Sequence, residues 1–252
     1  MSNPAPRTMI VTGGSKGIGA AIARTAGAAG FRVALTYKED GDGARAVALA
    51  IEQGGGEALT VKADVAREED VLALFAAVDA RFGPPDVLVN NAGGVGPLGR
   101  VEAIGAQALS EVLAVNVVGS FLCCREAVKR MSTRHGGKGG GIVNMSSRAA
   151  ELGGAGEWVH YAATKGAVDS LTVGLAREVA AEGIRVNAVA PGLIATSLHA
   201  AAGAPDRLER LGPSIPLQRP GTAQEVAEVV MWLASPQSSY VTAAIIPVGG
   251  GR

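Results

Sequence analysis

A tyrosine and a lysine stand four residues apart in the segment YAATK, residues 161–165. Residues at this spacing share a face of an α-helix, so a helix here would place Tyr161 beside Lys165. Free tyrosine is a weak acid with a pKa of about 10, and a nearby cation lowers that pKa because it favours the phenolate. The pair could therefore exchange a proton with a substrate, or it could be two ordinary surface residues.

A glycine-rich segment, TGGSKGIG, spans residues 12–19 between a strand-like run and a helix-like run. Glycines let the backbone approach a pyrophosphate closely, and the N-terminus of the following helix favours negative charge. In this strand–loop–helix context the segment predicts a dinucleotide site, whereas a glycine cluster elsewhere would indicate a turn. The residues that we expect to bind the dinucleotide here are Gly13, Ser15, Lys16, Gly17, Ile18 and Gly19.

Short apolar runs alternate with segments of helical spacing along the chain. We expect strands at 8–13, 32–37, 57–63, 86–92, 141–147, 184–191 and 243–248, and helices at 17–29, 43–53, 67–82, 106–133, 158–182 and 222–234. This alternation predicts a doubly wound Rossmann fold, with a seven-stranded parallel sheet and helices on both faces. No linker or repeat divides residues 1–252, so we expect one α/β domain. Segment 193–221 lacks a clear strand, and so long a loop is typical of a lid over a site.

The composition excludes several classes of function. Basic and acidic side chains number 23 each, which gives no reason to expect nucleic acid or an anionic membrane as a partner. No apolar run approaches the ~18 residues of a membrane span, and the first residues, MSNPAPRT, lack the apolar core of a signal peptide. We interpret the adjacent Cys123 and Cys124 as small buried residues of a cytoplasmic protein. No His, Cys and Asp residues have the spacing of metal ligands, so we expect no catalytic metal.

The spacing Gly13-x-x-x-Gly17-x-Gly19, together with Tyr161-x-x-x-Lys165, resembles the classical short-chain dehydrogenase/reductases over nearly the whole chain. Further matches, in order, are Asn90-Asn91-Ala92-Gly93, Asn116, Ser147 and Pro191-Gly192. The resemblance implies an oxidoreductase that transfers hydride between a nicotinamide and a carbonyl or secondary alcohol. In such enzymes the cofactor supplies the hydride, and the protein supplies orientation and the proton.

The resemblance also implies roles for four residues. Tyr161 would be the general acid/base, and Lys165 would lower the pKa of Tyr161 and hold the nicotinamide ribose. Ser147 would hydrogen-bond the substrate oxygen, whereas the neighbouring Ser146 should point the other way because side chains alternate along a strand. Asn116 would bind a water that links Lys165 to solvent.

The end of the second predicted strand bears on the choice of dinucleotide. Sheets that bind NAD usually carry an acid at this point for the ribose 2′-hydroxyl. Here Tyr37 and Lys38 stand there, and Lys38 and Lys16 are two cations near the expected 2′-phosphate, so we expect NADP(H) in preference to NAD(H). Alternatively, Lys38 is a solvated lysine beside acidic residues. The resemblance implies that Asp64 and Val65 contact the adenine. It also implies further contacts with the cofactor from Asn91, Ala92, Gly93, Pro191, Gly192, Ile194 and Thr196. Asp64 could instead cap the next helix.

The substrate is not defined by these motifs. The residues that we expect to line its pocket are Val95, Arg148, Leu152, Trp158, Leu193 and Leu198. Arg148 and Glu157 could bind a polar substrate, or Arg148 could pair with Glu151 on the surface. The closest subfamilies in style are 3-oxoacyl-carrier-protein reductases and glucose-1-dehydrogenase-like enzymes. A carrier-protein reductase needs a basic patch beside the site. Arg125, Lys129 and Arg130 could form this patch, or these charges could merely flank a subunit interface.

The resemblance implies a homotetramer or homodimer that acts on a small molecule. Two other functions are open. A dinucleotide-sensing regulator would have lost one or more of Ser147, Tyr161 and Lys165, and this chain keeps all of them. A sugar-nucleotide epimerase or dehydratase would carry a substantial C-terminal substrate domain, for which 252 residues leave no room.

Overall fold

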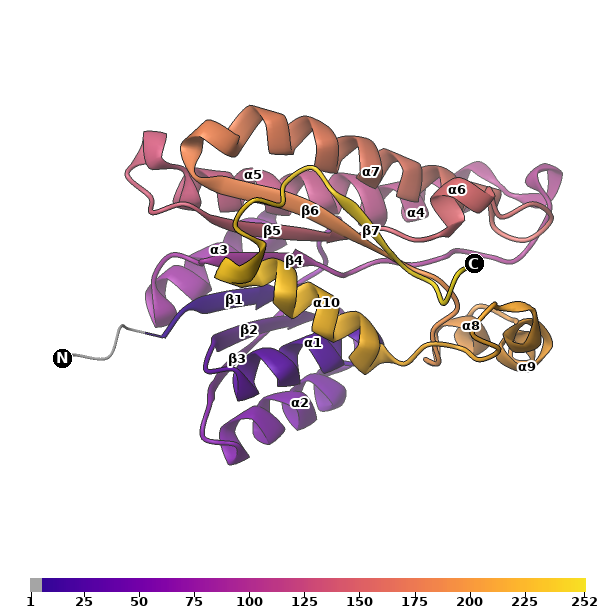
Figure 1. Ribbon diagram of the computed structural model, residues 1–252, viewed down its shortest axis with the longest axis horizontal. Coiled ribbons are helices and arrows are strands. Elements are labelled where there is room, and N and C mark those ends of the chain that lie inside the picture. Colours follow the sequence, from indigo (N-terminus) through magenta and orange to yellow (C-terminus); the bar gives the residue numbers. More distant parts are fainter. Residues whose placement is uncertain (1–5) are drawn as a thin grey trace.

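The computed structural model describes residues 6–252, apart from the side chain of His199. In this part of the chain, seven strands form one parallel sheet in the order β3-β2-β1-β4-β5-β6-β7 (Figure 1). The strands are β1 (Thr8–Val11), β2 (Arg32–Tyr37), β3 (Glu57–Lys62), β4 (Val87–Asn90), β5 (Gly140–Met145), β6 (Ile184–Pro191) and β7 (Ile245–Val248). The predicted doubly wound, seven-stranded parallel sheet is therefore confirmed.

Helices cover both faces of the sheet (Figure 1). One face carries α1 (Gly17–Ala28), α2 (Gly41–Gln53) and α10 (Ala223–Ala234), and the other carries α3 (Glu68–Phe82), α4 (Ala106–Leu113), α5 (Gly119–Met131) and α7 (Val159–Val179). Each face has its own apolar core, because a central strand such as β1 is buried on both sides: Met9 and Val11 point into one core and Ile10 into the other. The continuous apolar strands of the sequence are explained by this double burial.

Three strands end about two residues earlier than the apolar pattern predicts. The residues that follow them are Thr12-Gly13 after β1, Asn91-Ala92 after β4, and Ser146-Ser147 after β5. The hydroxyl of Thr12 accepts hydrogen bonds from the backbone N–H groups of Asn91 and Ala92, both at 3.0 Å. These residues therefore leave the ladder together and form a shared edge, where the parallel strands present their carboxyl ends.

The predicted helix at 106–133 is continuous but not uniform. Between α4 and α5 lies a π-helical turn, Ala114–Val118, whose wider turn is typical of functional sites. By length and composition the helix from Ala106 to Met131 could cross a membrane, contrary to the expectation that no segment approaches that length. A core helix passes the same test, and Cys123, Cys124 and Met131 of this helix are buried in the core beside α3 and α7.

Two short helices, α8 (Leu198–Ala201) and α9 (Arg207–Leu211), lie in the predicted lid segment 193–221. They extend beyond the carboxyl ends of the strands, on the right of Figure 1, below the end of the chain, while α6 (Ala149–Leu152) lies above it. The 3₁₀ turns are Val101–Ala103, Thr133–His135, Ala180–Glu182, Gly212–Ser214 and Pro236–Ser238. The fold thus gathers the lid, α6 and the strand ends at one edge of the sheet.

Candidate active site

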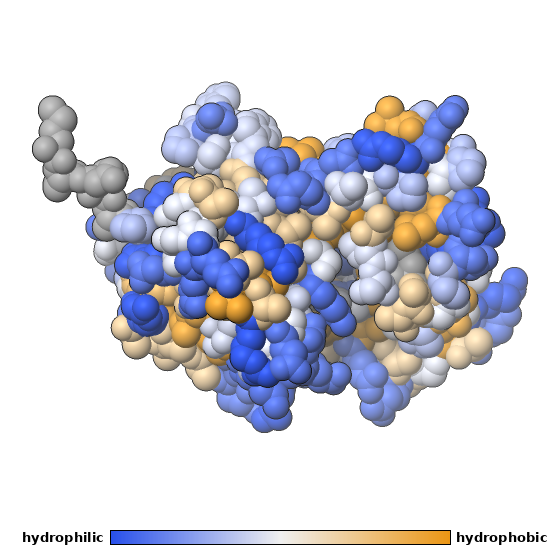
Figure 2. Space-filling view, turned by 90° about the horizontal axis from the view of Figure 1, so that it is seen from below, coloured by the Kyte–Doolittle hydropathy of each residue, from blue (hydrophilic) through white to orange (hydrophobic). Residues whose placement is uncertain are grey.

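A cavity of about 700 Å³ opens at this edge of the sheet. Figure 2 shows the molecule from below the view of Figure 1, with a hollow right of its centre. Except for Asn116, every residue that the sequence predicts for catalysis, for the cofactor or for the substrate pocket lines this cavity. The strand ends and the lid therefore bring together residues that lie up to 185 positions apart, from Gly13 to Leu198 (198 − 13 = 185).

The glycine-rich loop forms one wall of the cavity, and its glycines are required by its geometry. Gly13 and Gly17 have positive φ angles of 65° and 56°, which only glycine adopts readily. A Cβ atom at Gly19 would lie 2.2 Å from the carbonyl oxygen of Gly13, which is far inside contact distance. The loop then leads into α1, whose N-terminal N–H groups face the cavity and could hold a pyrophosphate.

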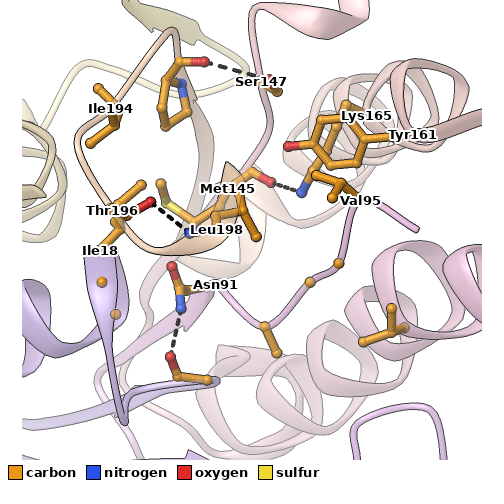
Figure 3. A pocket seen from close by; sticks show the side chains of 18 of the residues that line it. Ile18, Asn91, Val95, Met145, Ser147, Tyr161, Lys165, Ile194, Thr196 and Leu198 are labelled. Atoms are coloured by element: carbon orange, nitrogen blue, oxygen red, sulfur yellow. Dashed lines mark hydrogen bonds between the residues drawn. The ribbon is translucent and has the colours of Figure 1, made fainter. Parts of the chain in front are cut away.

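Asn91 fixes the position of this loop. Its side-chain Nδ2 donates hydrogen bonds of 2.9 Å to the backbone carbonyls of Thr12 and Gly13, and Figure 3 draws one of the two. On the other side, the hydroxyl of Thr36 accepts a 3.0 Å hydrogen bond from the backbone N–H of Gly13. The hydrogen bonds of Thr12 and Thr36 to the loop backbone were not predicted, because in the sequence each residue looks like an ordinary threonine of a strand.

The far end of the cavity contains an ion pair between Lys38 and Asp64, at 2.8 Å. Asp64 raises the pKa of Lys38 through a hydrogen bond and its charge. Burial favours a higher pKa for Asp64, but Lys38 more than offsets it and holds that pKa below its usual range. Asp64 does not cap α3, which begins at Glu68 with Arg67 as its N-cap, so the capping interpretation is wrong. The Lys38 side chain is 65% exposed and still accessible to a ligand.

Tyr161 and Ser147 lie side by side on the cavity wall and are hydrogen-bonded to each other. Burial raises the pKa of Tyr161, and a hydrogen bond with Ser147 lowers it only in part. Ser147 also accepts a 3.1 Å hydrogen bond from the backbone N–H of Ala149, which fixes its hydroxyl at the end of β5. As expected, Ser146 turns the other way, toward the backbone carbonyl of Lys165.

Lys165 lies on the same helical face as Tyr161 (Figure 3), with its Nζ 5.6 Å from the centroid of the tyrosine ring. Nζ donates a 2.6 Å hydrogen bond to the backbone carbonyl of Met145. Burial lowers the pKa of Lys165 to about 8, although the charge of Asp169 opposes this. The expected lowering of the Tyr161 pKa by Lys165 is not found in this geometry: the Lys165 ammonium is directed at Met145, and burial raises the pKa of the phenol.

Asn116 lies in the π-helical turn and does not reach the cavity wall. Its Oδ1 accepts from the backbone N–H of Gly94, and its Nδ2 donates to the carbonyl of Gly94 and to the hydroxyl of Thr164, all at 2.9 Å. Its side chain therefore positions the segment that follows β4. The water-binding role of Asn116 stays a prediction.

Three charged side chains near the lid have partners within the chain. Arg148 pairs with Glu151 at 2.6 Å and donates from Nε to the backbone carbonyl of Arg252 at 2.8 Å. Glu157 pairs with Arg207 of the lid, whose guanidinium lies 4.9 Å from the ring centroid of Trp158. The contributions of Arg207 and Arg252 to the wall were not predicted, because each depends on a contact between residues far apart in the sequence.

The proposed basic patch of α5 is neutralised. Arg125, Lys129 and Arg130 surround the buried carboxylate of Glu126, with N–O distances of 3.1, 2.8 and 3.0 Å. Arg125 also pairs with Glu68 at 2.7 Å, and Arg130 with Asp79 at 2.7 Å. These residues lie toward the end of α5 that leads back to the start of β5, away from the cavity. The interpretation as a docking surface for an acidic carrier is therefore not supported.

Known proteins are similar to this chain in sequence and in fold. A family model described as enoyl-(acyl carrier protein) reductase matches residues 13–252. The oxidoreductase YgfF of Escherichia coli, described as uncharacterized, is 49% identical over 243 residues, covering 96% of this chain and 98% of that protein. A 3beta-hydroxysteroid dehydrogenase of Eggerthella lenta is 41% identical over 249 residues, covering 97% and 93%. A 3-oxoacyl-[acyl-carrier-protein] reductase of Staphylococcus epidermidis is 36% identical over 245 residues, covering 97% and 98%.

Solved structures agree with these relatives. A mutant of a Serratia marcescens short-chain dehydrogenase/reductase superposes with a TM-score of 0.89 at 37% identity, covering 99% of both chains. A blue fluorescent protein from a metagenomic library, solved in complex with NADPH, superposes with a TM-score of 0.88 at 34% identity, covering 99% of both chains. The family resemblance that the motifs indicate is thereby confirmed.

Proposed function

The chain belongs to the short-chain dehydrogenase/reductase family of oxidoreductases, and on that premise we propose that it uses NADP(H) to interconvert a carbonyl and a secondary alcohol, with Tyr161 as the general acid/base. The observation that supports this proposal most directly is the arrangement of Ser147, Tyr161 and Lys165 on one wall of the cavity. A sensor without chemistry has no need to keep a partly buried phenol hydrogen-bonded to a serine at this place.

A nicotinamide bound in this cavity would supply the hydride for reduction of the carbonyl carbon. Ser147 donates a hydrogen bond to the carbonyl oxygen and orients it toward Tyr161. Tyr161 then gives its phenolic proton to that oxygen; the raised pKa means that the phenol is protonated at neutral pH and can act as the donor. Lys165 has donors to spare beyond the one that bonds Met145, and these are available to the ribose and to the phenolate that forms.

The preference for NADP(H) rests on charge at the end of β2. Tyr37 and Lys38 stand where an acid would select against a 2′-phosphate, and a 2′-phosphate would compete with Asp64 for the exposed ammonium of Lys38. Lys16 adds a second cation that makes no ion pair with any described residue. The matched structure with NADPH is consistent with this preference. Fluorescence titration should give a Kd for NADPH at least tenfold below that for NADH, and a preference for NADH would contradict the proposal.

The reaction class is tested by NADPH oxidation with a panel of neutral ketones, a β-ketoacyl thioester and an enoyl thioester. The enoyl thioester is included because of the description of the matching family model. We expect ketone reduction, because Ser147 and Tyr161 both direct donors at a carbonyl oxygen. Tight NADPH binding without turnover of any compound would instead favour the dinucleotide-sensing regulator.

We also propose a homotetramer or homodimer in the cytoplasm. Exposed apolar residues recur along α4, the π-helical turn and α5, which is the surface that a second copy would cover: they include Leu109, Leu113, Val118 and Phe121. Light scattering of the purified protein tests this assembly, and a monomer at micromolar concentration would contradict it.

A further inference from the structure

The substrate end of the cavity, defined here by Val95, Leu152, Trp158, Leu193 and Leu198, is apolar. Three of these side chains are buried, and the two others are 49% and 40% exposed. The indole Nε1 of Trp158 donates to a backbone carbonyl 3.3 Å away, so the ring contributes mainly apolar surface. Apolar walls with few polar groups bind ligands of matching character, so this end suits a hydrocarbon frame.

The cavity wall beside this apolar surface carries two cations that are each paired with a carboxylate: Arg148 with Glu151, and Arg207 with Glu157. Arg207 is 12% exposed and Glu157 is 29% exposed, and their side chains are in direct contact. The guanidinium of Arg207 also lies over the ring of Trp158, which holds the arginine between an aromatic face and a carboxylate. Burial favours a higher pKa for Glu157, but Arg207 and Arg210 more than offset it and keep the carboxylate charged at neutral pH.

An anionic substrate would therefore have to displace Glu157 from Arg207. Separating the two would leave a partly buried carboxylate without its partner, which is unfavourable. Arg207 nevertheless has unused hydrogen-bonding capacity, because its Nε is buried and has no partner among the described residues. The arginine could thus bind an anion if Glu157 lost its charge.

We propose that the substrate is a neutral, largely apolar ketone or secondary alcohol, and that Glu157 sets this preference by holding the guanidinium of Arg207 away from anionic substrates. This inference rests on the proposed function and adds the substrate class and a specificity-determining residue. Both groups line the cavity, and the pair joins the lid to the segment that directly precedes α7.

Other substrate classes fit this end of the cavity less well. A sugar needs a hydrogen-bonding partner for each buried hydroxyl, and the apolar side chains named above supply none. A carrier-bound acyl chain needs a basic surface, and the cations of α5 are already paired with Glu126, Glu68 and Asp79. One cation of the wall, Arg252, makes no ion pair with a described residue and is the competing candidate for binding an anion.

The test compares two ketones of one carbon frame, 4-oxocyclohexanecarboxylate and its ethyl ester, and adds acetoacetyl-CoA with NADPH and glucose with NADP⁺, because the anomeric carbon of glucose is oxidised and not reduced. For the unaltered protein we expect kcat/KM with NADPH to be at least tenfold higher for the ester than for the acid. The Glu157→Gln variant should shift this ratio at least fivefold toward the acid. Glu209→Gln, which removes the same charge from an exposed position of the lid, should leave the ratio unchanged.

A binding measurement gives a second readout, which still works if a variant loses turnover. The chain has two tryptophans, so Trp232→Phe leaves Trp158 as the only indole reporter. Quenching of its fluorescence by the ester and by the acid, with NADP⁺ present, should give the same order of affinities and the same shift in Glu157→Gln.

The outcomes separate the two proposals. Preference of the unaltered protein for the acid, for glucose or for acetoacetyl-CoA would overturn the substrate class while the proposed function stands. An unchanged ratio in Glu157→Gln would overturn the role of Glu157. If the protein turns over none of these four compounds and no ketone of the panel described above, the proposed function is overturned, and this inference with it.

Discussion

Lys165 donates a 2.6 Å hydrogen bond to the backbone carbonyl of Met145, the last residue of β5. This contact ties the catalytic face of α7 to the strand that delivers Ser147. It also keeps the ammonium 5.6 Å from the centre of the Tyr161 ring, so that the lysine is held in place by the strand. The relative positions of the three side chains are therefore set by a backbone group, which a substitution elsewhere in the cavity does not remove.

Replacement of Tyr161 by phenylalanine removes the phenolic proton and little else. We expect kcat to fall by about 10²–10⁴-fold, the usual contribution of a general acid/base, while the Kd for NADPH changes less than threefold. Tyr240→Phe is the matched control, because Tyr240 is fully exposed and far from the cavity wall. A Tyr161→Phe variant that retains its rate would exclude the tyrosine as the proton donor.

Replacement of Lys165 by methionine should abolish turnover and raise the stability of the folded chain. Burial holds the pKa of Lys165 at about 8, below the ordinary value of 10.5, which corresponds to a destabilisation of roughly 3 kcal/mol at neutral pH. Loss of the hydrogen bond to Met145 offsets about 1 kcal/mol of this. We therefore expect Lys165→Met to raise Tm at pH 7 by about 4–8 °C and to abolish turnover.

The pH dependence of that gain follows from the direction of the shift. Below pH 8 the lysine is protonated in both folded and unfolded chains, so the cost of burying its charge is complete. Between pH 8 and 10.5 the folded chain releases the proton first, and the stability of the unaltered protein rises relative to the variant. Thermal unfolding from pH 6 to 10 should show the difference in Tm shrinking, whereas Lys62→Met at an exposed position should show no such trend.

Lys38 offers a test of the cofactor preference. Its ammonium is the exposed partner of Asp64, and a 2′-phosphate would compete with that carboxylate for it. Lys38→Ala should raise the Kd for NADPH about tenfold and leave that for NADH within twofold, as measured by titration. Equal losses of affinity for both cofactors would show that Lys38 acts through Asp64 and the adenine end and does not bind a 2′-phosphate.

Two glycine-to-alanine substitutions should act in opposite directions. At Gly19 the new Cβ would meet the backbone of Gly13 at 2.2 Å, so Gly19→Ala should lower Tm and abolish NADPH binding. At Gly174, an exposed position of α7, nothing lies within 4 Å of the new Cβ. Gly174→Ala should therefore stabilise the protein by about 0.5–1 kcal/mol, because alanine is the better helix former. Normal NADPH binding by Gly19→Ala would contradict the described loop.

The sequence predicts the sheet well because every strand is a continuous apolar run between turn residues. The predicted length of three strands is too great by about two residues at the carboxyl end. Residues such as Asn91 and Ser146 directly follow the apolar run, but they lie beyond the last hydrogen-bonded pair of the sheet. Motifs place nearly every expected residue on the cavity wall, because the carboxyl ends of parallel strands must meet at one edge. The contacts of Asn116 with Gly94 and Thr164 could not be predicted, since a π-helical turn cannot be recognised from helical spacing alone.

Contacts between distant segments could not be predicted. The pair of Glu157 with Arg207 joins residues 50 positions apart, and nothing local distinguishes that arginine from its neighbour Arg210. The neutralisation of Arg125, Lys129 and Arg130 depends on the burial of Glu126, which sequence alone does not reveal. The direction of the Tyr161 pKa likewise depends on how deeply the fold encloses the ring.

The pairing of Glu157 with Arg207 has a consequence for how ionic strength acts on the two ligands. Dissolved salt screens a bare cation such as Lys16 far more than two opposite charges already in contact. The KM for NADPH should therefore rise from 20 mM to about 500 mM sodium chloride, while the KM for a neutral ketone stays nearly constant. The protein would then sense the ionic composition of its surroundings through its coenzyme alone.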